Sequence, residues 1–321
     1  MISRRATLLT LAALLVLPLA PLRAVADAPL RVVATTGMIA DAVRQIGGDH
    51  VEVKGLMGPG VDPHAYRQTR SDIVAMTRAD LVLWHGLYLE AQMESFFHDL
   101  SRKRNVVAVA EALPKEKLHG HDNYAEKYDP HVWMSPVLWK DVVAEVQRAL
   151  TEARPESADI FAANAAAHQR DLDRLAEYAA QSMAKVPENN RVLLTAHDAF
   201  GYFGAAFGIE VLGIQGISTE SEAGLNRIGE LVNLLVDRQI SAVFVESSVS
   251  DRSMRAVIEG AQAKGHDLQI GGELFSDAMG ADGTYEGTYI GMIDHNVTVI
   301  AAALGATVPG RGMDGKLSAG F

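Results

Sequence analysis

Three histidines and one aspartate stand where a chain could assemble a metal site. His64 and His131 each follow an Asp-Pro pair, His197 directly follows the apolar run RVLLTA, and Asp277 comes just after an expected strand. Imidazole nitrogens and a carboxylate oxygen are suitable ligands for a transition-metal dication. Proline fixes its own φ and holds the preceding residue extended, so each Asp-Pro-His tripeptide would present its histidine on a stiff stalk.

Spacing alone leaves the role of these residues open. The four positions are scattered over more than 200 residues, and no short metal motif such as HExxH joins them. Each histidine could equally be a hydrogen-bonded structural residue. The two aspartates of the tripeptides could instead orient a ligand ring through a hydrogen bond.

The elements that must position these residues alternate between strands and helices. We expect strands at residues 30–36, 51–57, 81–84, 106–109, 191–196, 209–214, 242–246 and 268–271. We expect helices between them at residues 37–47, 71–79, 89–100, 199–207, 226–238 and 252–263. This alternation predicts an α/β fold of two lobes with parallel sheets flanked by helices. Ligands gather outside the carboxyl ends of such strands, where all four candidates lie.

The middle of the chain has no strand signal and predicts helices at residues 139–150 and 157–185. The second would be a rod of about 40 Å joining the two lobes. We therefore divide the chain into a signal peptide (1–26), an N-terminal α/β lobe (27–150), a long rigid linking helix (151–188) and a C-terminal α/β lobe (189–321). The Gly-rich tail from Gly305 is expected to be frayed.

The first residues have the features of an export signal. A basic start with Arg4 and Arg5 precedes an apolar run at residues 6–19, and Ala24-Val25-Ala26 fits a signal peptidase site. Cleavage after Ala26 would release a mature protein into a bacterial periplasm. A membrane anchor is the alternative, and the paired arginines leave the general secretory and twin-arginine export routes both open.

Composition excludes several classes of protein. The 321 residues contain no cysteine, which excludes a disulfide scaffold, a cysteine zinc site, an iron–sulfur cluster and a cysteine nucleophile. A lipoprotein anchored through cysteine is likewise not expected. The net charge of −11 argues against a nucleic-acid partner, because phosphate contacts need a basic face.

Seven ordered segments give the sequence a specific resemblance. They are PHAYRQTRSDI (63–73), ADLVLWHGLYLE (79–90), DPHVWMSP (129–136), TAHDAFGYFGAAFGIE (195–210), GIQGISTESEAG (213–224), VFVESSVSDRSM (243–254) and ELFSDAMG (273–280). The chain resembles the metal-specific solute-binding proteins of bacterial ABC importers for zinc and manganese. The resemblance implies one dication bound between two lobes by His64, His131, His197 and Asp277. It also implies a monomer that catalyses no reaction and delivers its metal to an ABC permease in the inner membrane.

The transported metal is predicted to be Zn²⁺, with Mn²⁺ (or iron) as the alternative. Manganese-specific relatives commonly carry Glu where this chain has His197, and three imidazoles with one carboxylate suit zinc. Zinc-specific relatives, however, often carry a long His-rich loop, of which only His119 and His121 remain. These two could pre-capture metal or belong to a solvated loop.

A rival function is an exported zinc-dependent hydrolase. It would need a general base, for which Glu246 and Glu220 are candidates. Glu246 could instead orient His197 or form a capping hydrogen bond. His85 is expected to be a structural histidine, and residues 218–222 resemble a capping sequence before a helix.

Overall fold

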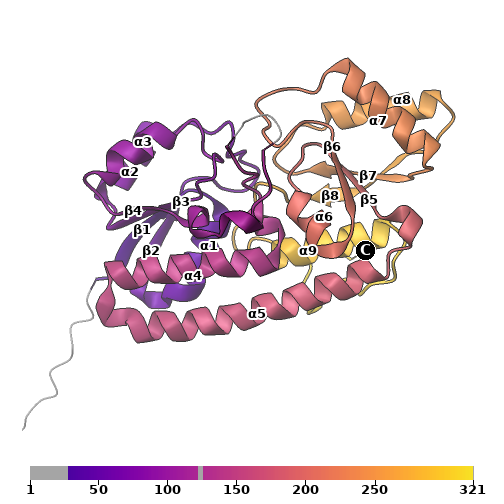
Figure 1. The fold of residues 1–321 in the computed structure, drawn as a ribbon. Coiled ribbons are helices and arrows are strands. Elements are labelled where there is room, and N and C mark those ends of the chain that lie inside the picture. Colours follow the sequence, from indigo (N-terminus) through magenta and orange to yellow (C-terminus); the bar gives the residue numbers. More distant parts are fainter. Residues whose placement is uncertain (1–27, 122–125, 321) are drawn as a thin grey trace, which may run out of the picture.

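Two α/β halves lie side by side in the structure, a computed structural model that describes residues 28–121 and 126–320 (Figure 1). The signal peptide expected over residues 1–26 lies outside the described residues. The predicted fold class is confirmed, because both halves contain parallel strands flanked by helices. None of the helices within these ranges is long and apolar enough to cross a membrane.

The first half is built on a four-stranded parallel sheet in the order β2-β1-β3-β4. Its elements are β1 (Leu30–Ala34), α1 (Gly37–Gly47), β2 (Val51–Gly55), α2 (Arg70–Arg78), β3 (Leu81–Trp84), α3 (Glu94–Ser101) and β4 (Val106–Ala108). All four residues of β3 are buried, as expected for an inner strand covered on both faces.

The second half repeats this plan with two parallel strand pairs. Its elements are β5 (Val192–Thr195), α6 (Gly201–Phe207), β6 (Glu210–Gly213), α7 (Leu225–Asp237), β7 (Ala242–Glu246), α8 (Arg252–Ala263), β8 (Gln269–Leu274) and α9 (Tyr289–Ala303). Strand β5 pairs with β6 and β7 pairs with β8, while β5 and β7 are neighbours. The carboxyl ends of β5, β7 and β8 therefore meet at one edge.

Two long helices connect the halves. Helix α4 (Pro136–Ala153) begins at the N-cap Ser135, whose hydroxyl accepts the N–H of Leu138. Helix α5 (Ala158–Ala184) has 27 residues, about 40 Å, and passes beneath both halves (Figure 1). Its buried residues recur at helical spacing from Phe161 to Met183, which makes one apolar face available to both halves.

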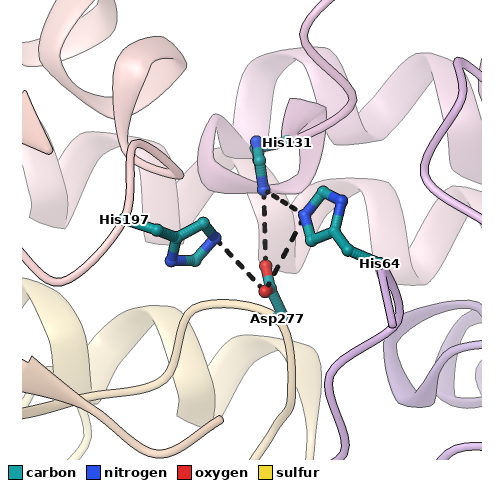
Figure 2. Close-up of side chains that lie close together, drawn as sticks. All are labelled: His64, His131, His197 and Asp277. Carbon is teal, nitrogen blue, oxygen red and sulfur yellow. Dashed lines mark hydrogen bonds and ion pairs between the residues drawn. The ribbon is translucent and has the colours of Figure 1, made fainter. Parts of the chain in front are cut away.

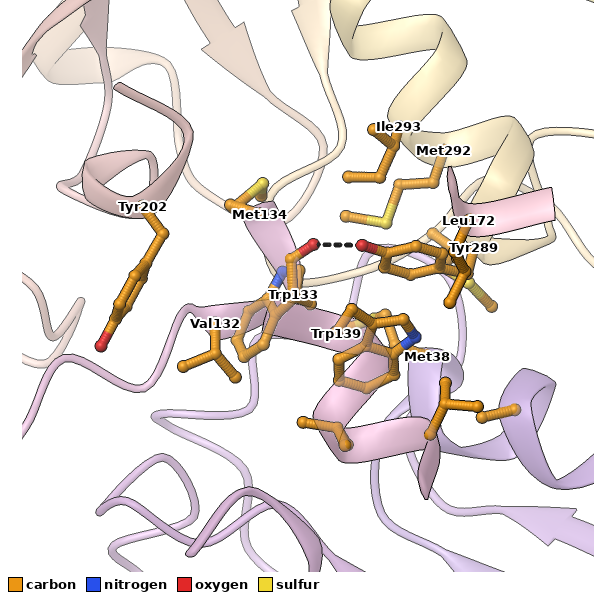
Figure 3. Close-up of a cluster of buried hydrophobic side chains, with 14 of the residues drawn as sticks. Met38, Val132, Trp133, Met134, Trp139, Leu172, Tyr202, Tyr289, Met292 and Ile293 are labelled. Atoms are coloured by element: carbon orange, nitrogen blue, oxygen red, sulfur yellow. Dashed lines mark hydrogen bonds between the residues drawn. The ribbon is translucent and has the colours of Figure 1, made fainter. Parts of the chain in front are cut away.

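A shared core fills the space where the halves meet (Figure 3). Trp139 of α4 stacks on Tyr289 of α9, with ring centroids 5.2 Å apart. The hydroxyl of Tyr289 donates to the carbonyl of Trp133 (2.7 Å), and its N–H donates to the Asp41 carboxylate of α1 (3.0 Å). The halves are therefore joined by buried side chains as well as by α5, and this packing opposes a wide hinge motion.

The C-terminal tail differs from our expectation of a frayed segment. Leu317 is fully buried, and the N–H and hydroxyl of Ser318 both donate to Glu286 (2.7 Å). The N–H of Met313 donates to the buried carboxylate of Asp294 (2.9 Å). These contacts fix residues 305–320 against the second half, although the segment has neither helix nor strand.

Candidate metal centre

The four predicted ligands converge on one point between the halves (Figure 2). Their ligand atoms all lie within 4.8 Å of one another, and all four residues are buried. Nε2 of His64 is 3.2 Å from Nε2 of His131. The Asp277 carboxylate lies 3.4 Å from Nε2 of His131, 3.2 Å from Nε2 of His197 and 3.9 Å from Nε2 of His64.

The two Asp-Pro-His tripeptides share one local hydrogen bond. In each, the aspartate accepts the backbone N–H of the histidine two residues later: Asp62 from His64 (2.8 Å) and Asp129 from His131 (2.9 Å). Only Asp129 also reaches its histidine ring, with Oδ1 2.7 Å from Nδ1 of His131. The first tripeptide thus fixes the backbone of His64, whereas the second fixes both the backbone and the imidazole ring of His131.

Glu246 at the end of β7 performs the orienting task for His197. One of its oxygens accepts the N–H of His197 (2.9 Å), and the other lies 2.6 Å from Nδ1. A carboxylate on Nδ1 directs Nε2 of the same ring toward the centre. Of the three roles that we considered for Glu246, its contacts with the N–H and Nδ1 of His197 fit the orienting one.

Asp277 reaches the centre on a loop that the other half helps to hold. The indole N–H of Trp133 donates to the carbonyl of Ser276 (2.8 Å), the residue just before Asp277. Within the described part of the chain, neither Asp277 oxygen has a hydrogen-bond partner. The carboxylate lies instead within ion-pair distance of the three imidazoles, and because its burial is costly unless a cation compensates it, the site is chemically suited to a dication.

Electrostatics divides the three histidines into two kinds. Burial lowers the pKa of His64 to about 3, against the attraction of Asp277. Burial also opposes protonation of His131, but Asp129 and Asp277 outweigh it and raise the pKa to about 9. Burial acts the same way on His197, whose pKa Asp277 and Glu246 raise well above its usual value. Burial would raise the pKa of Asp277, but His197 and its neighbours bring it well below the usual range.

The remaining candidate histidines lie around the centre rather than in it. His85 is buried and its Nε2 lies 2.7 Å from the carbonyl of Pro130, next to His131. His119 stacks on Tyr202 of the second half, with ring centroids 4.2 Å apart. His121 lines a small cavity together with His64. None of these three belongs to the group of four converging ligands found among the described residues.

Comparison with known proteins gives consistent matches over most of the chain. Residues 32–303 match the family described as zinc-uptake complex component A, periplasmic. The manganese-binding lipoprotein MntA of Bacillus subtilis is 50% identical over 271 residues, 84% of this chain and 88% of the relative. The zinc-binding protein TroA of Treponema pallidum is 46% identical over 270 residues, 84% of this chain and 87% of the relative. The solved structure of the periplasmic zinc-binding protein TroA superposes with a TM-score of 0.84, covering 86% of this chain and 99% of that one.

Proposed function

Because the chain belongs to the zinc-uptake complex component A family, we propose that it is a periplasmic solute-binding protein that captures one Zn²⁺ ion for an ABC importer. The observation that carries this proposal is the convergence of His64, His131, His197 and Asp277 within 4.8 Å in a buried site. The proposal includes export with cleavage after Ala26 and action as a monomer that hands its ion to a permease.

The donor set and its size favour zinc. Three imidazoles and one carboxylate make a closed four-coordinate shell of the kind zinc adopts in non-catalytic sites. Zinc–ligand bonds of about 2.05 Å give a tetrahedron whose edges are about 3.3 Å. Four separations between ligand atoms in this site run from 3.2 to 3.9 Å, and the whole set lies within 4.8 Å. Small side-chain shifts would thus complete the tetrahedron.

Manganese remains the second candidate, because the relative with 50% identity is named as manganese-binding. Mn²⁺ prefers more oxygen ligands than Zn²⁺. Among the described residues, Asp277 is the one oxygen donor of the four converging ligands. The chemistry of the donors therefore supports zinc, whereas the two relatives point to different metals.

The geometry of the site does not support the rival hydrolase function, which needs a free general base and an open position on the metal. Both carboxylates considered as general bases are engaged: Glu246 holds His197 through its N–H and Nδ1, and Glu220 accepts the side-chain amide of Gln92 (2.5 Å). A catalytic zinc also keeps an open position for water, which a four-ligand shell fills. The relatives reported above are named as metal-binding proteins.

Metal content and competition on the purified protein beginning at Asp27 test the proposal. We expect one tightly bound zinc per chain that excess manganese displaces poorly. Preference for manganese would keep the site but overturn the choice of metal, and the absence of any bound dication would overturn the function. The mass of the exported protein in solution tests whether it is a monomer, and its N-terminal sequence tests whether cleavage occurs after Ala26.

A further inference from the structure

The three ligand histidines are not held equally. His131 and His197 each have a carboxylate at Nδ1, 2.7 Å away for Asp129 and 2.6 Å away for Glu246. Within the described chain, no carboxylate makes such a contact with Nδ1 of His64. The hydrogen bond that fixes His64 locally is the one from its backbone N–H to Asp62 (2.8 Å).

Asp62 is in turn held by the other half of the molecule. Its second oxygen accepts the hydroxyl of Thr219 (2.5 Å), 157 residues further along the chain. Thr219 lies in residues 214–224, which join β6 to α7 without regular secondary structure. Glu220 makes a second cross-half contact, with Gln92.

Residues 218–222 therefore do not have the capping role that their sequence predicts. Helix α7 begins at Leu225, and its N-cap Gly224 makes no side-chain capping bond. The hydroxyl and carboxylate of this segment bond to the first half instead, since Thr219 donates to Asp62 and Glu220 accepts from Gln92. This leaves the segment as a strap across the junction of the two halves, beside the metal centre.

Two of the four ligands border cavities beside the metal centre. His64 lines a small one whose other walls include Ser218 and Glu220 of the strap and His121 of the first half, and Asp277 lines a separate one beside Gly58 and Met279. The four ligands are buried, so an ion cannot leave unless a ligand moves. Among the three histidines, His131 and His197 are each held by a carboxylate at the ring as well as at the backbone, whereas within the described residues a carboxylate holds His64 at its backbone alone.

We propose that Thr219, acting through Asp62, is a positioning residue for His64 and that this tie controls how fast the metal is released. The inference rests on the proposed function, since it concerns the same centre. With the tie intact, His64 stays on the ion. When the strap lifts, Asp62 loses its partner in the other half and His64 becomes the first of the three histidines to leave.

Thr219→Val tests the tie, because valine keeps the shape of threonine and removes the hydroxyl donor. We expect zinc transfer to excess chelator, followed by stopped flow, to be about tenfold faster than in the parent protein, the size of one charge-assisted hydrogen bond. Thr219→Ser, which keeps the hydroxyl, should restore the parent rate. Ser218→Ala is the matched control, because among the described residues that hydroxyl accepts a single hydrogen bond, from the N–H of Glu220 in its own segment.

A second readout separates positioning from a general loss of structure. Hydrogen exchange of the metal-free protein should show faster exchange of the His64 amide in Thr219→Val, with the His197 amide unchanged because Glu246 still holds it. Equal release rates in the variant and parent, or an equal effect of Ser218→Ala, would overturn the proposal. So would faster release with an unaltered His64 amide. A parent protein that binds no zinc would instead refute the proposed function.

Discussion

Zinc binding should release protons from the site, and the charges around the ligand histidines indicate how many. Three buried carboxylates surround the centre: Asp129, Glu246 and Asp277. In the metal-free protein they raise the pKa of His131 to about 9 and that of His197 well above its usual value, despite the burial of both rings. We therefore expect these two histidines to hold protons at neutral pH and His64, with a pKa of about 3, to be neutral.

The magnitude follows from the charges. A dication that binds must displace both imidazolium protons, so two positive charges leave and two arrive. Because the pKa values are raised, the affinity falls as the pH falls, and releasing two protons corresponds to about 100-fold in affinity per pH unit. This slope should hold at pH 6 to 8, between the pKa of His64 (about 3) and that of His131 (about 9), and it should flatten as the pH passes the latter.

Calorimetric titration with zinc in buffers of different ionisation enthalpy measures the protons released per ion. We expect about two at pH 7 in the parent protein. Glu246→Gln removes one of the carboxylates that raise the pKa of His197, so it should release about one proton and bind zinc some 10- to 100-fold more weakly. An affinity that does not change between pH 6 and 8, or a parent protein that releases no protons, would refute this account of the site.

Three further outcomes are expected. Asp277→Asn should weaken zinc binding by at least about 100-fold in competition assays, because it removes the only charged ligand, while Asp282→Asn on the exposed part of the same loop should leave binding unchanged. Trp133→Phe removes the indole N–H that holds the loop of Asp277 and should weaken binding about tenfold; a parent-like dissociation constant would show that the loop needs no such support. Gly312→Ala should lower the free energy of unfolding by about 1–3 kcal/mol, since φ is +77° and the new Cβ would lie 2.5 Å from a buried carboxylate oxygen. Gly283→Ala, where φ is +78° but the new Cβ would meet open space, should lower the free energy of unfolding by less. Thermal denaturation of both variants and the parent protein measures the difference.

The helices and strands predicted best from the sequence are those whose hydrophobic pattern and whose ends are both determined by residues close together in the chain. Strands β3 and β7 and helix α8 have the predicted bounds, because short apolar runs and a helical period end at clear breaks. Helix α3 begins at Glu94 instead of residue 89, because residues 87–93 form turns that begin with Leu87 and Tyr88 at positive φ. Helix α9 was not predicted: most of its residues are buried, so its sequence has no polar face to reveal a helical period.

The candidate site, too, could be predicted from the sequence only where local patterns determine it. Position after a strand accounts for His197 and Asp277, which follow β5 and β8 closely, because parallel strands deliver their carboxyl ends to one edge. His64 and His131 lie on loops well past the ends of β2 and β4, and their prediction depended on the Asp-Pro-His tripeptides and on the family resemblance. What holds these side chains depends on contacts between distant segments. The bond from Trp133 to Ser276 and the bond from Thr219 to Asp62 join residues 143 and 157 positions apart, and no local pattern marks such pairs.

The contact between α1 and α9 has a consequence for how the molecule is made. Asp41 and Tyr289 are 248 residues apart, yet the carboxylate of one accepts the N–H at the start of the helix that carries the other. The core that the two halves share is therefore completed only when nearly the last helix has emerged. Folds dominated by such distant contacts form slowly. A chain exported through a membrane in extended form would gain from this order of events, because it stays loose during passage and closes only when its C-terminal end arrives.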